Sequence, residues 1–193
     1  MTRARRASDW DKDLAAARAA EAELAGILAV DARLVDFADH TADFDRLDFS
    51  FSYRGLRVTL DLKEKRQTYS AQYRAMWPDV APEDLFIIDE TVYRRIVWQG
   101  GGGYLAVHDH PGGRWVTFGP WELTLGPRLR YQRWGQRAGP EFAKGKLLLD
   151  LSAGAHQAPE FRVDDLLGVI ERSIRGRDAV DAVAAAHPLP QIR

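Results

Sequence analysis

The chain has 193 residues, 46% of them hydrophobic and 28% charged, with a formal net charge of −1 at pH 7. This length and balance predict one globular domain, residues 1–193, with a hydrophobic core and no global electrostatic attraction to nucleic acid. The absence of cysteine excludes disulfides and thiolate metal sites, and the absence of a long apolar run predicts a cytoplasmic protein without membrane association.

Hydrophobic periodicity predicts the order of helices and strands in the first half of the chain. The first helix is expected over residues 11–30, capped by Ser8 or Asp9. The elements expected after it are strands over 33–37, 46–53 and 56–64, a helix over 71–77, a strand over 85–88, a helix over 90–99, and strands over 104–107 and 114–118.

The second half of the chain is expected to add an antiparallel extension and C-terminal helices. Residues 121–151 are expected to form further antiparallel strands, and 164–175 an amphipathic helix. An alanine-rich tail from Asp178 is expected to be helical until His187 and Pro188. Together the elements predict an α/β (α+β) fold with a central mixed β-sheet flanked by helices.

Two acids and a lysine lie on neighbouring strands of this prediction. Asp61 and Lys63 are two positions apart in a strand, so their side chains share a face, while Leu60 and Leu62 point to the core. The segment 52–55 is a hairpin turn signal, and an antiparallel hairpin there would bring Asp48 beside Asp61.

This order of elements, with Asp48, the Asp61-Leu62-Lys63 triplet and the hairpin between them, resembles the PD-(D/E)XK nuclease superfamily. The resemblance covers roughly residues 10–110 and implies a restriction endonuclease-like core. Leu47 stands where the motif name has proline, and the second acid is aspartate rather than glutamate. The resemblance implies a Mg²⁺- or Mn²⁺-dependent deoxyribonuclease serving restriction, phage defence, repair or recombination.

The same chemistry follows from the residue types. Mg²⁺ prefers hard oxygen ligands and keeps several waters, so Asp48 and Asp61, with the Leu62 carbonyl, would suffice to hold it. Lys63 would orient or deprotonate the attacking water and stabilise charge on the phosphate. The resemblance also implies a glutamate from the first helix as a catalytic and metal-binding residue, for which Glu23 is the first candidate and Glu21 the second.

Other candidate sites carry less specific patterns. His108 and His110 would share a strand face and could bind zinc, although no third ligand has a recognisable spacing. The glycines at 100–103 lead into a strand without a Gly-Lys-Ser/Thr sequence, so they are expected to end a helix rather than to bind phosphate. Ser152 lacks the flanking glycines of a nucleophile elbow. After the lysine, Gln67, Gln72 and Tyr73 are loose candidates for a family glutamine and tyrosine.

A basic segment rich in aromatic residues is the candidate nucleic-acid surface. Arginines interleave with aromatic side chains there. Such arginines could follow a phosphate backbone while the aromatic rings stack on bases, but the same pattern is equally typical of a solvated sheet face. The candidate DNA-binding residues are Arg128, Arg130, Arg133 and Trp134.

Three interpretations stay open at this point. The first is an active metal-dependent nuclease acting on DNA, with a homodimer or protein partner engaged through the region after Asp109. The second is a catalytically inactive nuclease-like subunit that binds nucleic acid or serves assembly. The third is an unrelated α+β protein in which Asp48 and Asp61 are ordinary strand residues. The distance between these two carboxylates decides among them.

Overall fold

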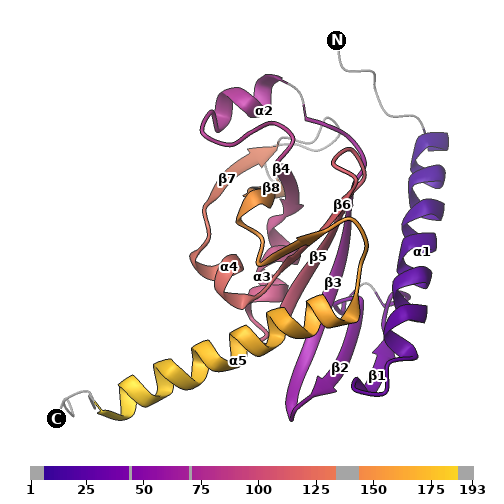
Figure 1. The fold of residues 1–193 in the computed structure, drawn as a ribbon. Coiled ribbons are helices and arrows are strands. Elements are labelled where there is room, and N and C mark those ends of the chain that lie inside the picture. The colour runs from indigo at the N-terminus through magenta and orange to yellow at the C-terminus, as the bar shows by residue number, and fades with distance from the viewer. Residues whose placement is uncertain (1–6, 44, 70, 134–143, 187–193) are drawn as a thin grey trace.

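The computed structural model describes residues 7–43, 45–69, 71–133 and 144–186 (Figure 1). It is a mixed α/β fold, as the sequence predicts, with a six-stranded sheet and a three-stranded sheet among the described residues. In chain order the elements are α1 (Ala7–Ala29), β1 (Val35–Asp39), β2 (Phe49–Tyr53), β3 (Leu56–Lys65), α2 (Ala71–Met76), β4 (Leu85–Asp89), α3 (Glu90–Val97), β5 (Gly103–Asp109), β6 (Arg114–Phe118), α4 (Pro120–Leu125), β7 (Arg128–Arg133), β8 (Lys144–Asp150), the 3₁₀ turn η2 (Leu151–Ala153), β9 (His156–Ala158) and α5 (Val163–Ala186).

The larger sheet is mixed, with strand order β1-β2-β3-β5-β6-β9. Strands β1, β2 and β3 form an antiparallel meander, β5 runs parallel to β3, and β6 and β9 continue antiparallel. The predicted hairpin is confirmed between β2 and β3. Its turn residues Arg54 and Gly55 both have positive φ, 49° and 77°, as a two-residue type I′ turn requires.

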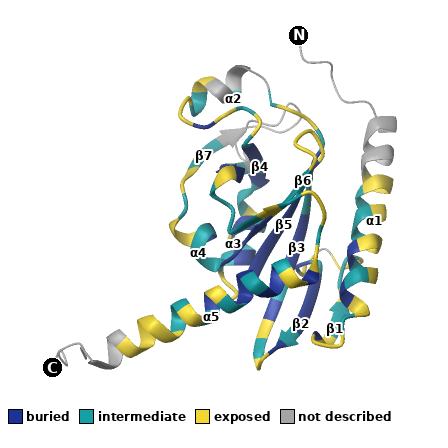
Figure 2. Ribbon diagram, in the orientation of Figure 1, coloured by how far each residue is buried: buried dark blue, intermediate teal, exposed yellow. Residues whose placement is uncertain are grey.

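One face of this sheet is covered by the two long helices. The β3 side chains Leu60 and Leu62 pack in one core cluster with Leu24 and Leu28 of α1, and α5 adds leucine and isoleucine side chains to the same cluster. Figure 2 shows the strands at the centre of the sheet buried, whereas the outer side of α1 and the far part of α5 are exposed.

The other face packs against α3 and the smaller sheet. Leu105 and Val107 of β5 share a second core cluster with Ile96 of α3 and with Phe86 and Leu149 of the smaller sheet. Strand β4 belongs to that smaller sheet, whose strand order is β4-β8-β7, and it pairs with β8 rather than with a strand of the main sheet. The main sheet therefore lies between two layers, one helical and one mixed.

Several boundaries differ from the expectations. Ser8 and Asp9 lie inside α1, because the helix begins at Ala7, so neither is the cap. The segment 121–151 begins with helix α4 rather than a strand, since Pro120 is at its first turn and Glu122 accepts the Gly119 N–H. The two helices expected near the C-terminus are one continuous helix, α5, which extends beyond the body of the molecule (Figure 1). Within the described residues, no helix is both long and apolar enough to cross a membrane.

Candidate functional site

The β2–β3 hairpin brings Asp48 and Asp61 together, as the sequence predicts. Phe49 pairs with Leu60, so one further step along the same register sets Asp48 opposite Asp61. The ammonium of Lys63 lies between the two carboxylates, with Nζ 2.6 Å from Asp61 Oδ2 and 3.6 Å from Asp48 Oδ2. A single cation therefore already reaches both acids.

A backbone carbonyl completes this cluster of oxygens. Lys63 Nζ donates a hydrogen bond to the Leu62 carbonyl at 2.8 Å. The Leu62 N–H in turn donates to Asp48 Oδ2 at 2.7 Å, which fixes the orientation of that carboxylate. The three oxygens around the ammonium are the same three that the sequence suggested as metal ligands.

Asp61 is an almost completely buried acid, only 3% exposed. Its Oδ2 accepts no well-directed hydrogen bond among the described residues, so its contact with Lys63 is an ion pair. Burial raises the pKa of Asp61 from 3.8 to about 6; the Lys63 charge opposes that rise and the Asp48 charge adds to it. Arg95 of α3 also lowers the pKa of this carboxyl.

Lys63 remains protonated in this setting. Burial by itself would lower the pKa of its ammonium, but the Asp61 and Asp48 charges outweigh burial, and the pKa is raised above its ordinary value. The site is thus a cation held by two acids of unequal burial.

Helix α1 contributes a different acid from the first candidate. Burial raises the pKa of Glu21, and the Asp48 charge raises it further, so Glu21 lies within electrostatic reach of the cluster. Glu23 is exposed and lines a pocket with Trp115 and Phe161. Burial and electrostatic interaction therefore favour Glu21 over Glu23 as the helix acid near Asp48 and Lys63.

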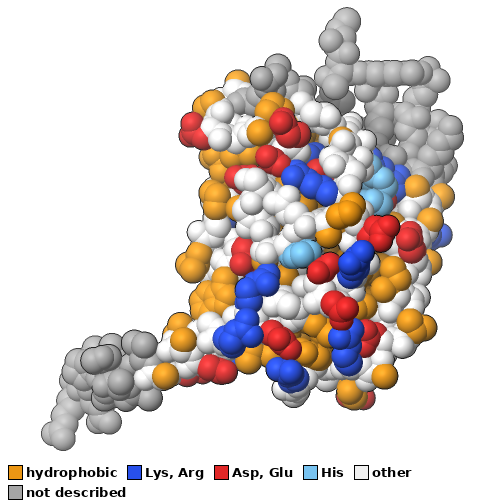
Figure 3. All heavy atoms as spheres, in the orientation of Figure 1, with side chains coloured by type: hydrophobic (Ala, Val, Ile, Leu, Met, Phe, Trp, Pro, Cys, Tyr) orange, Lys and Arg blue, Asp and Glu red, His pale blue; other side chains and the backbone are white. Residues whose placement is uncertain are grey.

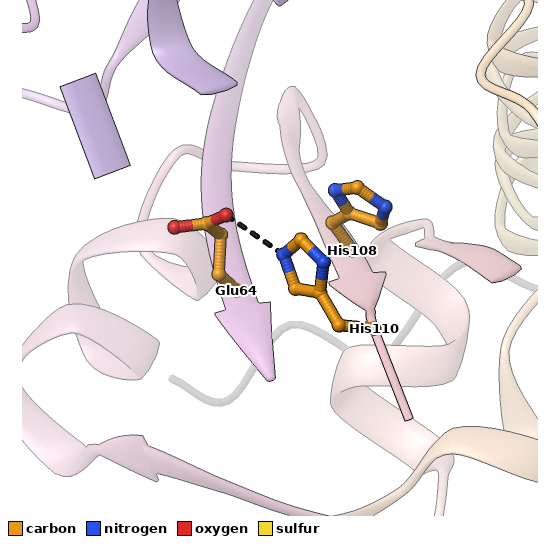
Figure 4. A group of neighbouring side chains, drawn as sticks. All are labelled: Glu64, His108 and His110. Atoms are coloured by element: carbon orange, nitrogen blue, oxygen red, sulfur yellow. Dashed lines mark hydrogen bonds and ion pairs between the residues drawn. The ribbon is translucent and has the colours of Figure 1, made fainter. Parts of the chain in front are cut away.

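A second cluster forms on the opposite face of β3. Glu64 is in register with His108 of β5, and His110 follows directly after that strand. His110 Nε2 lies 2.9 Å from Glu64 Oε1, and Figure 4 shows the two side chains pointing toward each other with the His108 ring beside them. One ligand atom from each of Glu64, His108 and His110 lies within 4.8 Å of the other two, which is a grouping that could hold a metal ion. Glu64 would be the third ligand of such a site, and sequence spacing did not reveal it.

The candidate nucleic-acid surface is only partly described. Arg128 lies over the ring of Tyr93 and donates to the Thr124 carbonyl at 2.8 Å, while Arg130 pairs with Glu90 at 2.8 Å. The side chain of Arg133 and the whole of Trp134 lie outside the described residues. On the face seen in Figure 3, acidic and basic side chains are mixed rather than gathered into a patch of one sign.

The remaining sequence candidates have structural roles. Gly100 and Gly101 have positive φ after α3, consistent with helix termination. Ser152 donates to Asp150 at 2.6 Å at the start of η2. Tyr73 packs edge-on against two other tyrosines, Gln67 is exposed, and the Gln72 side chain lies outside the described residues.

One ion pair between these strands was not predicted. Lys65 and Asp109 are completely buried and form an ion pair of 3.2 Å between β3 and β5.

Comparison with models of known protein families, with curated proteins and with solved structures finds no significant match to this chain.

Proposed function

We propose that this protein is a divalent-metal-dependent nuclease that hydrolyses phosphodiester bonds of DNA, with Asp48 and Asp61 as metal ligands. One observation carries the proposal: Asp61 Oδ2, the Leu62 carbonyl and Asp48 Oδ2 surround a single cation, the Lys63 ammonium, at 2.6, 2.8 and 3.6 Å.

The donor set suits Mg²⁺ or Mn²⁺. All three donors are hard oxygens, and two carboxylates are enough for an ion that retains several of its waters. Asp61 Oδ2 is buried and is paired with the Lys63 ammonium at 2.6 Å, so a metal ion would take the place that the ammonium now holds. When bound, such an ion lowers the pKa of a coordinated water and neutralises charge on the scissile phosphate.

The residues of the chain have separate roles in this proposal. Asp48 is oriented by the Leu62 N–H and so is preorganised as a ligand. Lys63 would leave the oxygens as the metal enters, and its ammonium would then donate hydrogen bonds to the attacking water or a phosphate oxygen. Glu21, whose carboxylate interacts electrostatically with both Asp48 and Lys63, would be the additional acid from α1.

The architecture supports the same proposal. The resemblance to PD-(D/E)XK nucleases depends on a hairpin that carries the two acids in a mixed sheet flanked by helices. The chain has that hairpin, with β2 and β3 antiparallel and β5 parallel to β3. Lys63 follows Asp61 on the same face of β3, so its ammonium can reach the cluster without any loop rearrangement.

Cleavage of plasmid and linear DNA tests the proposal. The protein is incubated with each substrate in Mg²⁺, Mn²⁺ or EDTA, beside Asp61→Ala and Lys63→Ala variants. We expect metal-dependent cleavage by the wild type, and a loss of about 100-fold or more in both variants, since each removes a charged group from the reacting centre. Asp79→Ala, which removes an exposed acid from a loop, is the matched control and should cleave like the wild type.

The outcomes separate the interpretations. Cleavage that survives in both variants would contradict the assignment of the site. An absence of cleavage by the wild type together with intact DNA binding would favour the nuclease-like subunit without catalysis. In that protein Lys63 would stay in place as the permanent cation of the cluster.

A further inference from the structure

We propose that Glu64, His108 and His110 form a second metal site, suited to a transition metal such as Zn²⁺ and distinct from the Asp48–Asp61 cluster. The proposal is independent of the nuclease activity, because it depends on a different set of side chains with different donor chemistry.

The donor set selects the class of metal. Two imidazole nitrogens and one carboxylate oxygen suit Zn²⁺ and neighbouring transition metals, whereas Mg²⁺ prefers oxygen alone. The donor atoms of Glu64, His108 and His110 lie within 4.8 Å of one another. Zinc bonds of about 2.0–2.2 Å would bring them somewhat closer, a movement that rotation of the exposed His110 ring can provide.

The surroundings hold each ligand in place. The His108 ring stacks on Trp115 with centroids 4.3 Å apart, and β3–β5 pairing fixes its position relative to Glu64. Arg66 binds Glu64 Oε2 and leaves Oε1 directed at His110. Such partners around metal ligands orient the ligands and support affinity. To bind a metal through Nε2, His110 would carry its ring proton on Nδ1, and the contact between Nε2 and Glu64 Oε1 would give way to bonds from both atoms to the metal.

Strand alternation separates the two sites. Asp61 and Lys63 are in register with Leu105 and Val107, on the face covered by α3 and the smaller sheet. Glu64 follows Leu62 on the opposite face, which α1 and α5 cover. The two clusters share no ligand, and Glu21 of α1 lies within electrostatic reach of both, of Asp48 and Lys63 in one and of Glu64 in the other.

The three ligands leave room for a fourth. Catalytic zinc sites hold the metal by three protein ligands and keep one position for water or substrate. Trp115, which stacks on His108, also lines a pocket of about 340 Å³ together with Glu23 and Phe161. Glu23, which lines this pocket, lies within electrostatic reach of His108, and its negative charge favours a cation there.

Zinc titration of the EDTA-stripped full chain tests the proposal. Isothermal titration is performed with ZnCl₂ in excess Mg²⁺, which occupies oxygen-only sites. We expect one equivalent of Zn²⁺ to bind, and affinity to fall at least about tenfold in His110→Ala and in Glu64→Gln. Asp61→Asn, in the other cluster, and His40→Ala, a histidine outside the site, should bind Zn²⁺ like the wild type.

Tryptophan emission gives a second readout that a loss of folding would not imitate. Paramagnetic Ni²⁺ or Co²⁺ bound beside His108 should quench the Trp115 emission, and the quenched fraction should vanish in Trp115→Phe while Zn²⁺ affinity is retained. Circular dichroism in EDTA checks that each variant is folded. The proposal is overturned if the wild type binds no equivalent of Zn²⁺, if His110→Ala and Glu64→Gln bind it undiminished, or if Asp61→Asn abolishes binding.

Discussion

At the scale of single residues, the site depends on how burial and charge compete at Asp61 and Lys63. Burial disfavours both charged forms, but the ammonium and the two carboxylates stabilise one another. The result is an acid with a raised pKa beside a lysine that stays protonated. The ion pair therefore keeps the cluster intact when no divalent metal is bound.

The pKa of Asp61 predicts a pH dependence of stability in the metal-free protein. Folding raises the pKa from 3.8 to about 6, so the folded state holds this proton more tightly than the unfolded state. The contribution is fully present below pH 4 and is lost as the pH rises to about 6, lowering the free energy of unfolding by about 1–3 kcal/mol. Urea denaturation in EDTA between pH 3.5 and 7.5 covers this pKa range. The free energy of unfolding should fall with rising pH in the wild type and not in Asp61→Asn. Equal slopes in the two proteins would contradict the prediction.

Removing the lysine charge should expose the competition between ammonium and metal. Lys63→Met leaves two acids without their shared cation, and we expect the metal-free variant to lose about 1–3 kcal/mol of stability at pH 7. Mn²⁺ should then raise its melting temperature more than that of the wild type, because no ammonium has to be displaced. A thermal shift no larger than that of the wild type would show that the metal does not bind at these oxygens.

At the scale of elements, the contact between α3 and β5 is unusually close. A Cβ at Gly103 would lie 2.0 Å from the Ile96 carbonyl oxygen, and one at Gly102 would lie 2.4 Å from the Arg57 carbonyl. These two glycines let the helix end and the strand start against neighbouring backbone. The glycines at 100–103 therefore end α3 and also allow the close backbone contacts at Gly102 and Gly103.

A glycine pair tests that contact. Gly103→Ala should lower the free energy of unfolding by about 1–3 kcal/mol, because backbone atoms must shift to admit the methyl group. Gly26→Ala is the matched control: it lies in exposed α1 with no atom within 4 Å of its Cβ, and it should stabilise by about 0.5–1 kcal/mol. Chemical denaturation measures both, and similar effects in the two variants would refute the steric argument.

The buried pair Lys65–Asp109 joins the ends of β3 and β5. Both side chains are fully buried, Arg114 also bonds Asp109, and Lys65 donates to the Glu83 carbonyl. Lys65→Met leaves a buried carboxylate with one partner fewer and should cost about 3–5 kcal/mol. The double variant Lys65→Met with Asp109→Leu should recover part of that loss in a double-mutant cycle. Additive losses in urea denaturation would show that the two groups are not coupled.

At the scale of the whole molecule, the first part of α5 packs against the sheet and its far part does not. Leu166, Leu167 and Ile170 belong to the core, whereas residues 179–182 are exposed. The far part of α5 extends away from the body (Figure 1). The helix is therefore anchored at its start and unsupported near its end.

Truncation separates the two parts of α5. A chain ending at Asp178 should retain its free energy of unfolding within about 0.5 kcal/mol, since residues 179–182 are exposed and bury little apolar surface. Ile170→Ala in the full-length chain should instead cost about 2–5 kcal/mol. Circular dichroism melts compare the two, and a large loss in the truncated chain would mean that the far part of α5 packs against something in solution.

Much of the fold was readable from local patterns. Alternation in β3 and the turn at Arg54 and Gly55 predicted the hairpin, and the 3.6-residue periods predicted α1 and the first part of α5. The strand expected over 85–88 was correct, but its partner was not predictable because β8 lies about sixty residues further along the chain. Helix α4 was missed because Trp121 and Leu123 also fit a strand pattern.

The sequence by itself determined the Asp48–Asp61–Lys63 cluster. A two-residue turn fixes the register of a hairpin, and that register decides which side chains of the two strands lie opposite each other. Only the tertiary structure decided the sites that need β3 beside β5. Glu64 and His108, or Lys65 and Asp109, meet through a parallel pairing whose register depends on the packing of the whole core rather than on any turn. The choice of Glu21 over Glu23 likewise depends on how α1 is rotated against the sheet, which packing sets and helical periodicity alone leaves open.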